Sequence, residues 1–232
     1  MKNYLQTIES LTKWLNGLIW AILGVKVLFL ILYSYSFYMF KNLYATEYYG
    51  DAMLQYTKLT MFMGIVSVVH TVLFITIIVF FLVWLVNMCN YLREHEYVST
   101  KSPFIVIYWF IPIISLFKPY QVIRELYKKL QAILIKNNRR GDVSLGGLVG
   151  LWWFLWIVVI AISVATPFIA LNNLKDIDFD FTMTINLISN FIFIIVTFLF
   201  LRIILRFSDM AEEFSEINWD GEEVDLSGHI ID

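Results

Sequence analysis

Four long apolar blocks limit what this chain can fold into. They lie at residues 14–39, 59–86, 145–171 and 184–205. A helix needs about 20 apolar residues to cross a hydrocarbon core about 30 Å thick, and each block reaches that length. The chain is 59% hydrophobic and 16% charged, whereas a soluble domain is about a quarter charged. We therefore predict an all-α integral membrane protein with four transmembrane helices.

The connection between the second and third spans, residues 92–144, holds most of the positive charge. Its nine basic residues are Arg93, Lys101, Lys118, Arg124, Lys128, Lys129, Lys136, Arg139 and Arg140. The other two connections hold Lys41, Lys58 and Lys175. Because Lys and Arg concentrate in the cytoplasmic loops of membrane proteins, we expect the central connection and both termini to lie in the cytoplasm.

An apolar run at residues 104–117 lies inside this connection and is too short to cross a membrane. Pro112 interrupts the run and, because it has no N–H, would break a helix there. The freed carbonyl groups then need partners, so the segment should be either re-entrant against protein or interfacial at the headgroups. Pro119 follows and suits the first turn of a new helix.

A basic amphipathic helix is predicted from Pro119 onward. Apolar residues recur at helical spacing between Val122 and Ile133, and basic residues occupy the other faces. We expect this helix to lie on an anionic leaflet and to contact lipid headgroups. The candidate headgroup-binding residues are Arg124, Lys128, Lys129, Lys136, Arg139 and Arg140.

Two ionisable residues stand out inside the spans, Lys26 in the first and His70 in the second. Ionisable groups inside a membrane are costly and are therefore functional candidates. At similar depth, the two residues would suit a substrate or proton pathway. Two simpler interpretations stay open: Lys26 can extend toward the cytoplasmic interface, and a neutral His70 can hydrogen-bond to a neighbouring helix.

Small and polar residues predict how the spans pack against one another. Helices that pack closely in lipid carry small residues at their contacts, and polar side chains bond across them. The candidate contact residues are Thr60, Gly64, Ser67 and Thr71 on the second span, Gly146, Gly147 and Gly150 on the third, and Asn186, Asn190 and Thr197 on the fourth.

Residues 207–232 are expected to form an acidic cytoplasmic tail, separate from a four-helix transmembrane domain at residues 1–206. The tail holds nine acidic residues and no Lys or Arg. This composition is typical of disordered segments. Two roles stay open for it: a loose electrostatic cover over the basic connection, or a solubilising extension.

The sequence contains no catalytic or metal-binding constellation. The single cysteine, Cys89, excludes an intrachain disulfide and a cysteine-cluster metal site. Alternating aspartates at residues 176–180 resemble the start of a calcium loop, but Phe181 and Leu187 replace its glycine and glutamate. Residues 94–96 (EHE) are adjacent and would point apart on a helix. We therefore expect no enzyme activity, no cofactor and no nucleic-acid binding.

Three pieces of the sequence resemble the bacterial membrane proteins grouped as domain of unknown function 4328. They are Trp84 with Asn90; Trp109, Phe110, Ile111, Pro112, Lys118, Pro119, Tyr120, Arg124 and Glu125; and Gly150, Leu151, Trp152 and Trp153. The resemblance covers residues 60–206 and departs at Tyr127, where a tryptophan would be expected. It implies a four-helix, multi-pass protein of the bacterial inner membrane, and it brings no established activity.

These observations favour a non-enzymatic membrane scaffold or regulatory subunit. It would bind anionic lipid headgroups, a membrane-protein partner or further copies of itself through the central connection. The alternative is a small oligomeric transporter or channel that uses Lys26 and His70. A continuous polar cavity reaching His70 would favour transport, whereas a dry bundle would favour a scaffold.

Overall fold

The computed structural model describes residues 2–43, 49–93, 102–111, 113–139, 144–172 and 179–217. All regular structure in these ranges is helical, which confirms the predicted all-α class. The elements, in chain order, are α1 (Lys2–Leu43), α2 (Tyr49–Arg93), α3 (Ser102–Ile107), a 3₁₀ helix η1 (Ile114–Leu116), α4 (Lys118–Lys136), α5 (Ser144–Asn172) and α6 (Phe179–Ser215).

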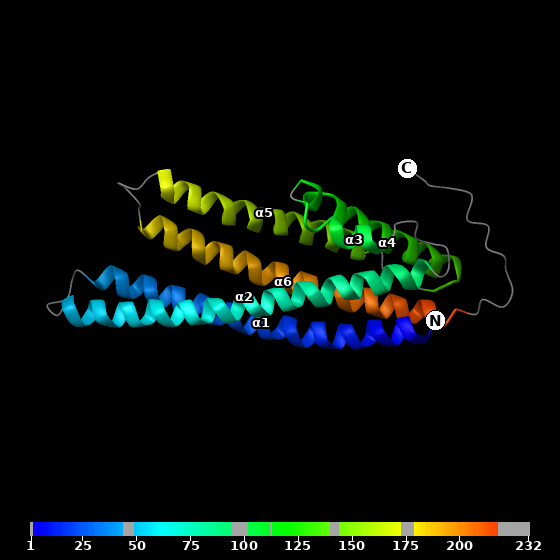
Figure 1. Ribbon diagram of the computed structural model, residues 1–232, viewed down its shortest axis with the longest axis horizontal. Helices are drawn as coiled ribbons and strands as arrows, with labels where there is room; N and C mark the ends of the chain where they lie inside the picture. The colour runs from blue at the N-terminus through cyan, green and yellow to red at the C-terminus, as the bar shows by residue number, and fades with distance from the viewer. Residues whose placement is uncertain are drawn as a thin grey trace.

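Four helices in the described part of the chain, α1, α2, α5 and α6, are long and apolar enough to cross a membrane. Each contains one of the predicted spans. They alternate in direction along the bundle, as the colours in Figure 1 show. A helix satisfies its own backbone hydrogen bonds, which lipid cannot do, so long apolar runs fold as helices there. The four-span prediction is confirmed.

The short elements gather at one end of the bundle (Figure 1). Helix α1 packs against α2 and α6, and α5 packs against α6. Helix α3 packs against α2, and α4 packs against α5 and α6. We call this end the α4 end: it comprises α3, η1, α4, the first turns of α1 and α5, and the last turns of α2 and α6. The opposite end holds the end of α1 and the start of α2.

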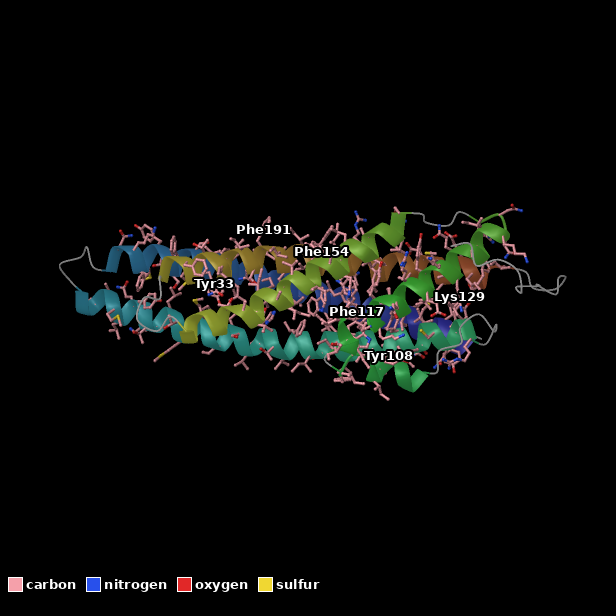
Figure 2. All side chains as sticks on the ribbon, turned by 90° about the horizontal axis from the view of Figure 1, so that it is seen from above. Tyr33, Tyr108, Phe117, Lys129, Phe154 and Phe191 are labelled. Atoms are coloured by element: carbon pink, nitrogen blue, oxygen red, sulfur yellow. The ribbon has the colours of Figure 1, made fainter. Side chains whose placement is uncertain are left out.

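Large apolar side chains cover the outside of the bundle. Phe154 and Phe191, on α5 and α6, are 64% and 58% exposed (Figure 2). A water-facing surface of this kind would be an aggregation site. Lipid is the solvent that such a surface fits, which agrees with the multi-pass membrane assignment.

The small residues of the second span do not pack as predicted. Thr60, Gly64, Ser67 and Thr71 are all exposed on α2, and a Cβ added at Gly64 would meet no atom within 4 Å. The prediction of a helix contact on this face is wrong within the chain. Spacing identifies a shared face, but it does not identify what lies opposite.

Hydroxyl groups in the spans bond to their own helix. The Thr197 hydroxyl donates to the Phe193 carbonyl oxygen at 2.8 Å, and the Thr71 hydroxyl donates to the Ser67 carbonyl oxygen at 2.9 Å. A carbonyl four residues back can satisfy a hydroxyl without a second helix. The expected bond from Thr197 across the bundle is therefore wrong.

Helix α6 continues beyond the predicted end of the transmembrane domain. Phe207, Met210, Ala211 and Phe214 recur at intervals of three and four residues, and all are buried against the bundle. Residues 207–215 are therefore helical, which differs from the disordered tail expected to begin at residue 207. The sequence interpretation relied on the number of acidic residues and overlooked this apolar stripe. The stripe is the sequence signal that identifies the helix. The predicted tail from residue 218 onward lies outside the described residues.

The longest helices exceed the thickness of a membrane. Helices α1, α2 and α6 contain 42, 45 and 37 residues, so they are about 55–70 Å long at about 1.5 Å per residue. A hydrocarbon core is about 30 Å thick. These helices are therefore longer than the core is thick, and parts of them project from it.

Candidate functional site

Helix α4 uses its apolar face to pack on the protein. Pro119 lies in its first turn, where a missing N–H costs nothing. The buried residues of the helix are Pro119, Val122, Ile123, Leu126, Tyr127, Leu130, Ile133 and Leu134. The predicted amphipathic helix is present, but its apolar face meets α5 and α6 and not lipid.

A close approach between α4 and α5 depends on one of the predicted glycines. A Cβ added at Gly146 would lie 2.9 Å from Cε1 of Tyr127. Gly147 faces open space, and a Cβ at Gly150 would meet only the Tyr120 hydroxyl at 3.8 Å. Gly146 is therefore the glycine that lets the two helices meet.

The basic residues of α4 face outward at the α4 end. Arg124, Lys128, Lys136 and Arg139 are exposed. Lys129 forms an ion pair with Glu125 at 2.9 Å, so its charge is partly compensated. The remaining candidate, Arg140, lies outside the described residues. Because the bundle holds the apolar face, the positive charges occupy fixed positions on a packed helix.

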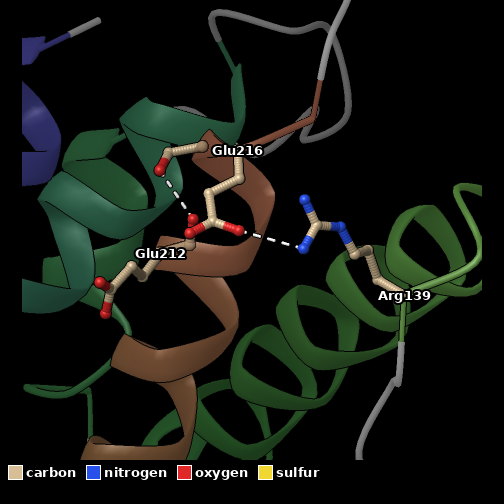
Figure 3. Close-up of polar contacts among 4 residues, drawn as sticks. Arg139, Glu212 and Glu216 are labelled. Carbon is tan, nitrogen blue, oxygen red and sulfur yellow. Dashed lines mark hydrogen bonds and ion pairs between the residues drawn. The ribbon is translucent and has the colours of Figure 1, made fainter.

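An ion pair joins the residues that follow the ends of α4 and α6. Nη1 of Arg139 lies 3.0 Å from Oε2 of Glu216 (Figure 3). In the same turn, the Ser215 hydroxyl donates to the Glu212 carbonyl oxygen at 2.7 Å. The paired side chains are 40% and 57% exposed, so water screens the pair and it adds little stability. This contact involves a residue that directly follows α6, and the role of the tail from residue 218 onward stays a prediction.

Lys26 and His70 are both half-buried and lie against the same two aromatic rings. The Lys26 Nζ lies 4.1 Å from the Phe193 ring centroid and 5.8 Å from that of Phe29. The His70 ring lies 5.8 Å and 6.0 Å from the same two rings. A cation over an aromatic face is attracted to it, which offsets part of the cost of the charge in lipid. The two predicted residues therefore share one aromatic cage, and their function stays a prediction.

Polar partners are scarce in this cage. The buried Nε2 of His70 has no hydrogen-bond partner among the described residues. No described acidic residue forms an ion pair with Lys26. The ring of Phe74 stacks on His70 at 6.1 Å. The surroundings of the pair are thus mainly aromatic.

A cavity of about 310 Å³ lies next to this cage. Its wall residues are Ile19 and Ile22 of α1; Phe74, Ile77, Ile78 and Phe81 of α2; Trp109, Phe110 and Ser115 between α3 and α4; Trp152, Trp153, Trp156 and Ile160 of α5; and Phe193, Val196, Thr197 and Phe200 of α6. Phe74 and Phe193 belong both to the wall and to the cage around His70. The walls are almost entirely apolar, so the cavity offers no polar path to His70. No sequence pattern indicated this cavity.

Three tryptophans of the sequence motifs named above, Trp109, Trp152 and Trp153, line this cavity. The Trp109 ring meets Phe81 edge-on at 5.4 Å and Trp153 at 6.1 Å. Trp152 stacks on Phe200 at 5.4 Å. The Trp153 Nε1 donates to the Leu116 carbonyl oxygen at 3.0 Å. Residues far apart in the sequence therefore form one aromatic junction between the spans and the central connection.

Other motif residues have separate roles. Trp84 is 1% exposed and donates to the Thr12 hydroxyl oxygen at 3.0 Å. The Asn90 side-chain oxygen accepts a bond from Arg93 at 3.0 Å. Pro112 lies outside the described residues, so the predicted break there stays a prediction. Residues 94–96 and 176–178 also lie outside them, and the described residues contain no cluster of His, Cys, Asp and Glu that could hold a metal ion.

One family model matches the chain. It is the model described as Domain of unknown function (DUF4328), and it matches residues 55–209, more than half of the 232 residues. The match begins within α2 and ends within α6, so it includes the aromatic junction and α4. No curated protein and no solved structure matches the chain.

Proposed function

The chain belongs to the Domain of unknown function (DUF4328) family, and from that premise we propose that it is a non-enzymatic membrane scaffold or regulatory subunit that gathers anionic lipid headgroups on the basic face of α4. The observation that supports this function is the division of α4: its apolar residues are buried in the bundle, and Arg124, Lys128 and Lys136 are exposed. Because α4 is already packed on the bundle, lipid binding does not require the helix itself to become ordered.

The proposal places the α4 end in the cytoplasm. Basic residues concentrate at this end, and they concentrate on the cytoplasmic side of membrane proteins. The cytoplasmic leaflet carries anionic lipid, and each basic residue near it contributes about 1 kcal/mol of attraction. The resemblance to bacterial inner-membrane proteins supports that membrane as the location.

The alternative function, an oligomeric transporter, is supported by the shared cage of Lys26 and His70. The adjacent cavity has apolar walls, whereas a pathway for ions or protons needs polar groups or water. This contrast favours the scaffold or regulatory function over transport.

Reversing three charges tests the proposed function. In the variant Arg124→Glu, Lys128→Glu, Lys136→Glu, we expect the preference for phosphatidylglycerol over phosphatidylcholine to fall by about 1 kcal/mol per residue at low salt. The loss should shrink as salt increases, because ions screen exposed charges. The preference is measured by native mass spectrometry of the lipids retained by the full-length protein.

A charge-preserving variant is the matched control. Arg124→Lys, Lys128→Arg, Lys136→Arg keeps every charge in place and should retain the wild-type preference. If the reversed variant binds phosphatidylglycerol as well as the wild type does, the basic face of α4 is not a lipid-binding surface.

A further inference from the structure

The cavity lies among the four described helices that are long and apolar enough to cross a membrane. Its walls come from the membrane-spanning parts of α1, α2, α5 and α6. Helix α5 packs on α6 and α2 packs on α1, and α2 and α5 do not form a packed pair in the described part of the chain. The space between α2 and α5 is therefore bordered by hydrocarbon and not by water.

The segment that closes the cavity toward the α4 end presents apolar residues to its surroundings. Phe110, Ile113 and Phe117 are 71%, 76% and 61% exposed, and Figure 2 labels Phe117 beside α4. Trp109 and Ser115 of the same segment line the cavity. Exposed apolar patches mark contacts with membrane or with protein, and in a membrane protein this patch is suited to contact with lipid.

A series of contacts connects the cavity to an exposed positive charge. The cavity-wall ring of Trp153 stacks with Tyr120 at 6.4 Å. The Cζ of Arg124 lies 6.0 Å from the Tyr120 ring centroid. Arg124 forms no ion pair with a described residue. A guanidinium group binds a phosphate through two parallel hydrogen bonds, which makes this position suitable for a phosphate group.

We propose that the cavity holds part of one acyl chain of an anionic phospholipid whose headgroup lies at Arg124. The apolar walls match the chain, and the exposed guanidinium matches the phosphate. A volume of about 310 Å³ lies at the lower limit for a small-molecule pocket, so it accommodates a piece of one chain. This inference rests on the proposed function and adds a specific, one-lipid site to it.

Filling the cavity tests this site. Ile160→Trp places a larger side chain in the cavity wall, whereas Val164→Trp, one turn further along α5, places it on a face that is 55% exposed. The full-length protein in mild detergent is titrated with phosphatidylglycerol, and retained lipids are counted by native mass spectrometry. We expect one retained lipid in the wild type and Val164→Trp, and about tenfold weaker retention in Ile160→Trp.

A second pair of variants, on α6, separates filling of the cavity from misfolding. Val196 is buried in the cavity wall, and its neighbour Ile195 is 39% exposed. Val196→Phe should weaken retention, and Ile195→Phe should not, among variants that keep the wild-type helix content and melting temperature.

Three results would contradict the site. If the filled variants retain the lipid as the wild type does, the cavity is not the lipid-binding site. If the charge-reversed variant alone then loses the lipid, the proposed function still holds. Filled variants that change the number of chains per particle without changing lipid retention would assign the cavity to a second copy. Loss of the lipid on filling, with full retention in the charge-reversed variant, would contradict the headgroup contact and the proposed function together.

Discussion

Replacing Trp84 by alanine is expected to lower the free energy of unfolding by about 3–5 kcal/mol, the usual cost of removing a large buried ring. Trp84 is 1% exposed. It stacks on Phe81 at 6.1 Å and meets Phe207 edge-on at 6.0 Å. Its Nε1 donates to the Thr12 hydroxyl oxygen, which in turn donates to the Ile8 carbonyl oxygen. The ring therefore joins α1, α2 and the extended part of α6.

Unfolding of the purified protein in mild detergent, followed by circular dichroism, measures this effect. Trp20→Ala is the control, because Trp20 is 57% exposed on α1. Trp84→Phe keeps an apolar ring and removes the donor, and it should cost about 1 kcal/mol. Equal destabilisation by Trp84→Ala and Trp20→Ala would mean that Trp84 is not a core residue.

Introducing leucine at Gly146 is expected to destabilise the protein by about 1–3 kcal/mol, the range for overpacking a close contact. Even a Cβ at this position would lie 2.9 Å from the Tyr127 ring. A leucine side chain would push α4 away from α5 and disturb the burial of its apolar face. The melting temperature of the full-length protein measures the loss.

Gly147→Leu is a closely matched control, since it makes the same change one residue later, where a Cβ would meet nothing within 4 Å. This variant should melt at or above the wild-type temperature, because leucine favours a helix more than glycine does. If the two variants have the same melting temperature, the packing of α4 does not depend on a close approach to α5.

Features set by the period and length of the apolar pattern were predictable from the sequence. The four spans and α4 follow from runs of apolar residues and from helical spacing, which act locally. The close approach at Gly146 also followed from residue type, because only glycine leaves room for a neighbouring ring. For Lys26 and His70, the sequence predicted only that the two residues lie at a similar depth in the membrane, and not that they share aromatic neighbours.

Features set by the choice of packing partner were not predictable. The small residues on the exposed face at Gly64 recur at the same spacing as small residues in a helix–helix contact. Only the arrangement of the helices shows whether such a face is exposed or packed. The cavity exists because α2 and α5 do not form a packed pair in the described part of the chain. The sequence of a single helix does not show which other helix it will pack against. Residues 207–215 were misjudged because their acidic residues outweighed the apolar stripe that docks them.

The most direct test concerns the orientation of the α4 end, on which the proposed lipid-binding function depends. In a Cys89→Ala background, single cysteines are placed at Asp51 and Ala132, which are exposed on α2 and α4 at opposite ends of the bundle. Labelling uses a membrane-impermeant maleimide on bacterial cells with a permeabilised outer membrane and an intact inner membrane. We predict labelling of Asp51→Cys in these cells, and labelling of Ala132→Cys only after the inner membrane is opened. Equal labelling of both positions in these cells, or labelling of Ala132→Cys alone, would contradict a cytoplasmic α4 end.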